Sequence, residues 1–167
     1  MCWINWFGIR ANRRWYWYYG IDTMSFHWLE MRISEEQERR QREAQILDRL
    51  PRGLEEIHSA LTECIESFTA SFGAESADMR LEGTKIRIAI REQEEGKWQQ
   101  RNKVEISANP TVPGFQIERG GEPLIIEMGM LPGDKLFYRD REHDQYLSME
   151  ELTRRILDRA LFPDLGE

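Results

Sequence analysis

Three side chains in the middle of the chain have the chemistry of a magnesium-dependent hydrolase. They are Asp78 and, further along, Glu95 and Lys97 of the tripeptide Glu95-Gly96-Lys97. Two carboxylates can hold Mg²⁺ beside a lysine that neutralises charge on a reacting phosphate. However, the surrounding stretch EQEEGK is polar and contains a glycine, which predicts a hairpin turn. A short acidic match also arises easily by chance in a chain with 30 Asp and Glu residues. The turn therefore argues against a nuclease site.

A second cluster of potential metal ligands lies near the C-terminus. The stretch DREHD places four such side chains in one turn: Asp140, Glu142, His143 and Asp144. These residue types do bind metals, but closed sites in proteins combine several histidines or cysteines. One histidine in a charged stretch between two apolar runs is typical of a solvated hairpin loop. We expect no metal there.

The remaining candidates fit structural roles. Cys64 lies on the apolar face of a predicted helix, where a thiol behaves as a small hydrophobic group. His58 lies at the edge of the same face, beside Glu55 and Glu56. The glycines lack the spacing of a phosphate-binding loop, and no glycine-framed serine marks a nucleophile. We therefore expect no cofactor, and the sequence favours a protein that is not an enzyme.

Composition limits the class of protein. A chain of 167 residues fits one domain with a short appendage. Its two cysteines, Cys2 and Cys64, match no zinc or redox spacing, and this favours a reducing, cytoplasmic location. The net charge of −7 argues against a nucleic-acid partner, which would need a basic patch. No apolar run reaches the roughly 18 residues of a membrane-spanning helix.

The N-terminal segment, residues 1–31, differs from the rest. It contains RRWYWYYG, and five of the six tryptophans lie in it; only Trp98 lies elsewhere. Three interpretations remain open: an upstream extension or disordered arm, a part of the core, or an anchor. Membrane contact through residues 3–28 would use interfacial aromatics, but the segment has no clear helical period, so we do not favour it. We place a domain boundary near Met31, with a single domain over 32–167.

Two stretches around this domain's sheet region have the pattern of helices. Ser34 and Gln37 have the spacing of a capping box at the start of a helix over 34–50, and Pro51 predicts a restart. The apolar residues of 54–72 then follow one helical face up to Gly73. Near the C-terminus, Ser148 and Glu151 form a second capping box before an amphipathic stretch that Pro163 ends.

Between the helices, alternation with a period of two predicts strands. In TKIRIAIRE, isoleucines occupy every second position, as in a strand with one buried face. Five further stretches have strand character: ADMRLE, WQQRNKVEIS, FQIER, EPLIIEM and DKLFYRD. We expect Gly120-Gly121 to form a two-residue hairpin turn. The fold class is therefore α+β: an antiparallel meander of about five to six strands, with an N-terminal helix or helix pair and a C-terminal helix on one face.

Two of these stretches, LIIEM and KLFYR, are apolar at consecutive positions. Strands of that kind are usually covered on both faces. The predicted helices cover only one face, so the other would need the N-terminal aromatics, a ligand or another chain. We expect a partner to bind at Leu124, Ile125, Ile126, Met128, Leu136, Phe137 and Tyr138.

Three loose resemblances accompany these patterns. Asp78 with Glu95-Gly96-Lys97 resembles the motif of PD-(D/E)xK nucleases, although that family has a strand where EQEEGK predicts a turn. The order of helix, antiparallel sheet and helix resembles the dimeric chaperones of bacterial type III secretion, which insert a helix where this chain has only ANPTVPG. The strand-rich middle and closing helix also resemble helix-grip ligand binders.

Together these features predict an acidic intracellular binding or adaptor domain. It would act through protein contact, with self-association into a homodimer as one form of that contact. The alternatives are a small-molecule binder with a cavity between sheet and helices and, less in keeping with the turn at Glu95, a Mg²⁺-dependent nuclease.

Overall fold

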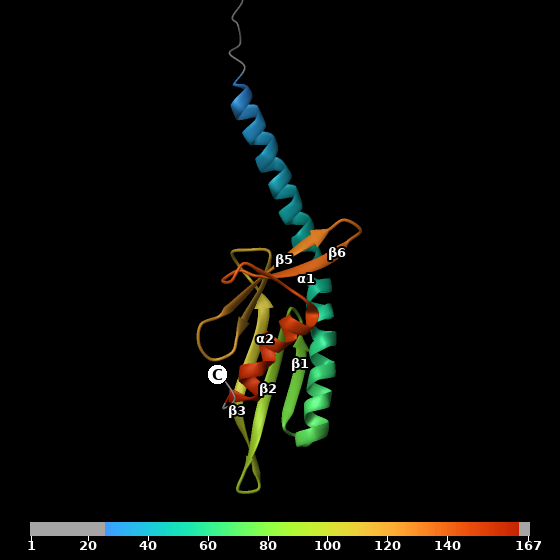
Figure 1. Cartoon of the computed structure of the whole chain (residues 1–167), viewed down its shortest axis with the longest axis vertical. Helices are drawn as coiled ribbons and strands as arrows, with labels where there is room; N and C mark the ends of the chain where they lie inside the picture. The colour runs from blue at the N-terminus through green and yellow to red at the C-terminus, as the bar shows by residue number, and fades with distance from the viewer. Residues whose placement is uncertain (1–25, 164–167) are drawn as a thin grey trace, which may run out of the picture.

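The computed structural model of the protein describes residues 26–163 as a long helix, a sheet of seven strands and a short helix (Figure 1). Helix α1 spans His27–Phe72 and helix α2 spans Met149–Leu161. The strands follow one another between them: β1 (Ala77–Glu82), β2 (Lys85–Glu94), β3 (Lys97–Ala108), β4 (Gly114–Glu118), β5 (Leu124–Leu131), β6 (Lys135–Asp140) and β7 (Gln145–Leu147).

Every strand pairs antiparallel with its neighbour in sequence, giving the order β1-β2-β3-β4-β5-β6-β7. The predicted α+β class with an antiparallel meander is thereby confirmed. The predicted strand count is wrong, because there are seven strands rather than five to six. The additional strand is β7, whose three residues directly follow the DREHD stretch and were not predicted as a strand. So short a segment shows no alternation, and only pairing with β6 makes it a strand.

One face of the sheet carries the apolar core. Alternate residues such as Ile86, Ile88 and Ile90 of β2 are buried beneath the helices, while their neighbours Arg87 and Ala89 face the other side. This open face is charged over β1 to β4. Lys85, Arg87 and Lys103 surround Glu105 at 2.9, 3.2 and 3.1 Å, and hydrogen bonds from these cations lower the pKa of Glu105 to about 2.

Helix α1 runs without interruption through Pro51, so the predicted restart of the helix there is wrong. The helix also begins at His27, which places Ser34 inside it rather than at its start. It runs through Met31 without a break. The half before Pro51 is inclined to the half that packs on the sheet (Figure 1), as expected where a proline removes a backbone hydrogen bond.

Gly53 allows α1 to approach the sheet closely. A Cβ atom at this position would lie 2.5 Å from Met128 Sδ and 3.3 Å from the Phe115 ring. Beside it, the Tyr138 hydroxyl lies 3.4 Å from the Gly53 carbonyl oxygen and 3.3 Å from Glu56. Burial and the adjacent Glu56 raise the pKa of Tyr138, so the phenol remains protonated and can donate a hydrogen bond.

Local turn and capping signals account for most of the connections. Glu95 and Gly96 form the tight β2–β3 turn with φ of 50° and 80°, as predicted for EQEEGK. The loop around Gly120-Gly121 is longer than predicted, since β4 ends at Glu118 and β5 begins at Leu124. The capping box at the start of α2 is confirmed, with Ser148 and Glu151 bonded to each other's backbone N–H.

Candidate functional site

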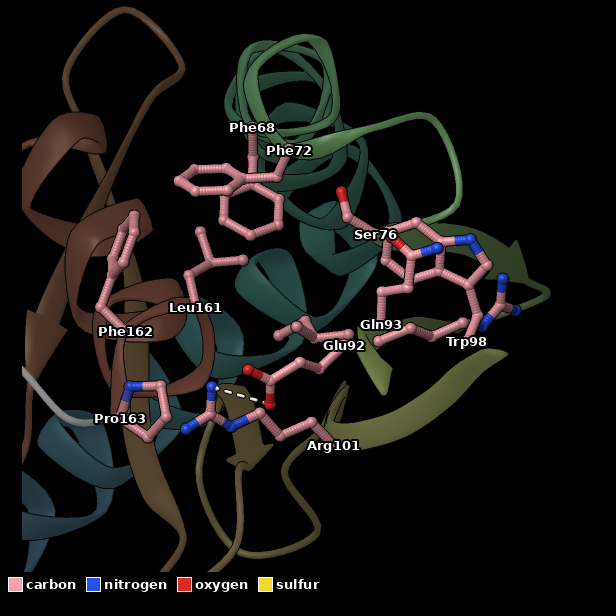
Figure 2. A pocket seen from close by; sticks show the side chains of 12 residues that line it. Phe68, Phe72, Ser76, Glu92, Gln93, Trp98, Arg101, Leu161, Phe162 and Pro163 are labelled. Atoms are coloured by element: carbon pink, nitrogen blue, oxygen red, sulfur yellow. Dashed lines mark ion pairs between the residues drawn. The ribbon is translucent and has the colours of Figure 1, made fainter. Parts of the chain in front are cut away.

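An aromatic cleft opens between the far ends of the two helices and the β2–β3 hairpin (Figure 2). Phe68 and Phe72 point from the last turns of α1 toward Leu161 and Phe162 at the end of α2. The ring centroids of Phe68 and Phe72 lie 4.6 Å apart, and Phe162 stands edge-on at 5.9 Å from Phe68. The cleft encloses about 330 Å³, at the lower end of the range for small-molecule sites.

Both helices end at positions that keep this cleft open. Gly73, with φ of 107°, ends α1, and its N–H donates to the Thr69 carbonyl oxygen. Pro163 follows α2 and lies on the opposite wall. Phe72 is therefore held at the rim with 58% of its surface exposed, and Phe162 with 37%. Two adjacent aromatic rings left open to solvent are a feature of binding surfaces.

The polar rim of the cleft comes from β2 and β3. The pairing of β2 with β3 shifts by one residue here: Ile90 is opposite Asn102 and Arg91 is opposite Gln100, so Arg101 forms a β-bulge between them. Such a bulge redirects a side chain, and Arg101 reaches the cleft and pairs with Glu92 at 3.1 Å. The rim therefore places Arg91 and the Glu92–Arg101 ion pair beside an apolar floor. This combination can bind an apolar or aromatic group that carries an acid.

The other chemically notable group is the buried carboxylate of Asp140, at the end of β6. It is fully buried and bonds to His143 Nδ1 at 2.8 Å and to the Arg155 guanidinium of α2. Burial alone raises the pKa of Asp140, but hydrogen bonds from His143 and two backbone N–H groups, with the charge of Arg155, hold it below its ordinary value. The network fixes the β6–β7 turn and ties α2 to the sheet.

The side chains considered for metal or nuclease chemistry form no such site in residues 26–163, although Asp140 and His143 are in contact. Among residues 26–163, no group of three histidine, cysteine or acidic side chains is arranged to hold a metal ion. Asp78 pairs with Arg80 at 2.9 Å on β1, opposite Ala89 of β2. Glu95 lies six residues beyond Ala89, at the tip of the hairpin and about 20 Å away along the strand.

Cys64 and His58 occupy the positions expected from the sequence. Cys64 is partly buried and packs against the core. His58 is half-buried on α1, and its carbonyl oxygen accepts a hydrogen bond from the Thr62 hydroxyl. Neither side chain lines the aromatic cleft.

The seven residues predicted to bind a partner lie on both faces of the sheet. Leu124, Ile126, Met128 and Tyr138 are buried under the helices, and Leu136 packs against the same core. Ile125 and Phe137 are on the open face, where Phe137 contacts Tyr146 of β7 at 5.4 Å between ring centroids. Phe137 also covers Gly129, whose missing side chain leaves room for the ring. This contact accounts for the apolar residue Phe137 on the open face, between Leu136 and Tyr138 on the core side.

A third surface is the first half of α1, residues 27–49, which we call the arm. It extends away from the sheet (Figure 1), and the first buried residue of α1 is Gly53. Four large apolar side chains of the arm's tip are exposed: Trp28 (65%), Leu29 (41%), Met31 (50%) and Ile33 (49%). The described ion pairs of residues 27–48 all join side chains three or four positions apart within the helix.

A small apolar cleft lies at the base of the arm, where α1 reaches the sheet. It is lined by residues that include Leu47, Leu50 and Pro51 of α1, Leu81 of β1 and Phe115 of β4, and it encloses about 300 Å³. Leu47 remains 51% exposed at its edge. We call it the base cleft. The predicted alternation gave no sign of it, because it forms only where one helix crosses the end of the sheet.

Comparisons of the chain with models of protein families, with curated proteins and with solved structures found no match. Within the described part of the chain, no helix combines the length and apolar character needed to cross a membrane. The residues of the aromatic N-terminal segment before Phe26 lie outside the described range. A functional proposal therefore depends on the geometry of the cleft, the arm and the base cleft.

Proposed function

We propose that this protein is a cytoplasmic binding or adaptor domain that acts through protein contact. The observation that supports this proposal most directly is the arm. It is a helix of 23 residues, about 35 Å long, in which no residue is buried. Apart from its base, where Ile46 packs against the core and Arg49 pairs with Asp134 at 3.1 Å, this helix stands clear of its own domain and is positioned to contact something else.

Energetics supports the same conclusion. Most helical stability in proteins comes from packing of one face, which the arm largely lacks, and each exposed ion pair contributes only about 0.3–0.5 kcal/mol. Ion pairs such as Glu36–Arg40 stabilise a spacer without any apolar residue. The exposed Trp28, Leu29, Met31 and Ile33 would be unfavourable in a simple spacer, since they present apolar surface to water. They are explained if another protein covers the tip.

In this proposal, only two of the seven residues predicted on β5 and β6 can contact a partner directly. Ile125 and Phe137 remain available on the open face, together with the exposed Leu131 and Tyr146. The other five predicted residues belong to the core or pack against it, and they act by supporting this face. The arm is therefore the principal contact surface, and the β5–β7 patch is secondary.

The proposal can be tested by placing a photo-crosslinking side chain at Met31 in the full chain and irradiating it in the host cell. We expect a discrete covalent adduct, because a partner covers the tip. The matched control carries the same group at Glu95, which is exposed at the β2–β3 turn and far from the arm. An adduct yield from Met31 no greater than that from Glu95 would contradict the proposal.

The aromatic cleft favours a second candidate function, the binding of a small apolar ligand that carries an acid. Its support is the combination of the Phe68, Phe72 and Phe162 rings with Arg91 and Arg101 at the rim. Arylalkanoic acids should raise the melting temperature of the wild-type protein, because a ligand that binds only the folded state stabilises it. The shift should be lost in Phe72→Ala and kept in Tyr146→Ala, a change of a similarly exposed ring elsewhere. A flat response in the wild type would contradict it.

A further inference from the structure

We propose that the partner of the arm is a second copy of this chain, and that two arms pair antiparallel over residues 28–47. This inference deepens the proposed function and rests on it. It commits to one occupant for the exposed tip and for the base cleft. The spacing and charge of the arm's side chains support it.

Six side chains of the arm form one continuous seam. They recur at alternating intervals of three and four residues, which places them along one side of a helix. At its inner end the seam runs on into Leu50 and the buried Ile57, so it is the outward extension of the face that packs on the sheet. Its members are Leu29, Arg32, Glu36, Arg39, Glu43 and Ile46.

An antiparallel pair matches this seam with itself at every layer. If the midpoint lies between Gln37 and Glu38, Leu29 meets the partner's Ile46, Arg32 meets the partner's Glu43, and Glu36 meets the partner's Arg39. The two-fold axis then repeats these three layers in reverse order. On the flank of the seam, Glu35 meets the partner's Arg42. Within the seam and on this flank, apolar residues therefore meet apolar residues and each charge meets its opposite.

Other arrangements of two arms do not have this match. A parallel, in-register pair would put Arg32, Glu36, Arg39 and Glu43 each against its own copy, which is four layers of like charge. Shifting the antiparallel pair by one heptad places Leu29 opposite the partner's Arg39 in one direction. In the other direction it places Ile46 opposite the partner's Glu36. Like charges and buried unpaired charges act against a register, so the pattern selects one arrangement.

The ends of the pair supply the apolar contact. With this register, the partner's Trp28 and Leu29 lie at the mouth of the base cleft, beside the exposed Leu47 and the half-buried Ile46, which also packs against the core of its own chain. Leu47 is 51% exposed in the single chain, and so is much of Trp28. The cleft of about 300 Å³ provides a place for the partner's tip. Apolar burial at the two ends gives affinity, while the charged middle fixes orientation.

The ion pairs within one arm are compatible with the contacts between two paired arms. Glu36 lies 2.8 Å from both Arg39 and Arg40 of its own helix, and these side chains are more than 40% exposed. In the pair, the same carboxylate can also accept hydrogen bonds from the partner's Arg39. Side chains already extended along the helix surface need little rearrangement to make the contact.

The test uses two charge-reversal variants of the full chain, Glu36→Arg and Arg39→Glu, in sedimentation velocity. Each variant alone places two pairs of like charges in its homodimer. We expect self-association roughly tenfold weaker or more for each, relative to the wild type. In a one-to-one mixture, the substituted position 36 of one chain and the substituted position 39 of the other carry opposite charges again. The unsubstituted Arg39 and Glu36 also face each other, so the mixture should recover dimers close to the wild-type level.

This recovery separates pairing from simple loss of helix. Each chain in the mixture keeps its own altered residue, so damage confined to one chain would persist and dimers would not return. Three results would overturn the inference: a wild-type protein that stays monomeric, single variants that associate like the wild type, or a mixture that stays as weak as its components. Because Met31 lies two residues from Leu29 and therefore on another side of the helix, a second crosslinking side chain at Leu29, within the seam, separates the two proposals. An adduct of the chain with itself fits both, whereas an adduct with a different protein supports the proposed function and contradicts self-pairing.

Discussion

The two halves of helix α1 have the same backbone geometry and opposite sources of stability. The half after Pro51 buries Leu54, Ile57, Leu61 and Ile65 against the sheet. The arm buries no residue and is instead covered with ion pairs such as Arg32–Glu35 and Arg42–Glu38. Burial of one isoleucine contributes more than several exposed ion pairs together. One helix can therefore combine a segment fixed by its own domain with a segment left available for a partner.

The largest contrast is expected from removing the same side chain in each half. Ile57→Ala should lower the free energy of unfolding by about 2–5 kcal/mol, because Ile57 is fully buried and leaves a cavity. Ile33→Ala, at 49% exposure in the arm, should change it by less than about 0.5 kcal/mol. Urea denaturation at low protein concentration measures both. Equal losses of unfolding free energy for the two variants would mean that Ile33 in the arm is packed as tightly as Ile57 in the core.

The second largest contrast is expected in the unfolding free energy lost when a buried or an exposed charge network is disrupted. Asp140→Asn removes the charge that holds His143 and Arg155, and we expect a loss of about 2 kcal/mol in unfolding free energy. Glu36→Gln, in the exposed Arg39 and Arg40 network of the arm, should have a much smaller effect. Calorimetric melting of both variants gives the comparison. A smaller loss for Asp140→Asn than for Glu36→Gln would show that burial does not strengthen the network.

Substitution by alanine should lower the stability of the protein in the packed half of α1 and raise it slightly in the arm. Gly53→Ala improves helix propensity but brings a methyl group to 2.5 Å from Met128 Sδ, so we expect a net loss of about 1–2 kcal/mol. Ser34→Ala in the arm replaces an exposed serine with a better helix former and should slightly stabilise the helix. Thermal melting followed by circular dichroism measures both changes. A stabilised Gly53→Ala variant would indicate that Met128 moves aside freely.

Acid should affect the arm through its carboxylates. Hydrogen bonds from Arg39 and Arg40 lower the pKa of Glu36 to about 2. Because the pKa is lowered in the folded helix, the stabilisation is complete above the ordinary pKa of a glutamate and is lost as pH falls toward 2. Amide signals of residues 34–43 should lose helical character between about pH 5 and pH 2, the smallest effect here. Glu36→Gln should flatten that change. A pH-independent arm would contradict the role of the ion pairs.

Regular patterns were predictable from the sequence, and irregular ones were not. The isoleucines of β2 and the Ser148–Glu151 capping box have local signals, and both elements lie where predicted. Ser34 carries an equally good local signal but lies inside α1, because the preceding residues continue the helix. β7 has three residues and depends wholly on pairing with β6. Local patterns cannot represent such dependence on tertiary context.

The candidate site was less predictable than the fold. Phe68 and Phe72 were assigned to one helical face, yet Phe72 is 58% exposed, at the rim of the cleft where only the ring of Phe162 lies across from it at 6.4 Å. Trp98 and Arg101 reach the aromatic cleft through a register shift that has no sequence signature. The consecutive apolar residues of β6 suggested a second covered face. They are explained in part by Phe137 lying over Gly129.

Pro51 lies where the arm meets the domain, and it separates the two halves thermodynamically. A proline cannot donate a hydrogen bond to the Leu47 carbonyl oxygen, and carrying a helix across it costs about 3 kcal/mol. Unwinding that starts at His27 therefore meets a natural stopping point before it reaches Gly53 and the core. The arm can therefore unwind without unfolding the domain. A partner that orders it would be adding structure to an already complete domain, without any change in the sheet beneath.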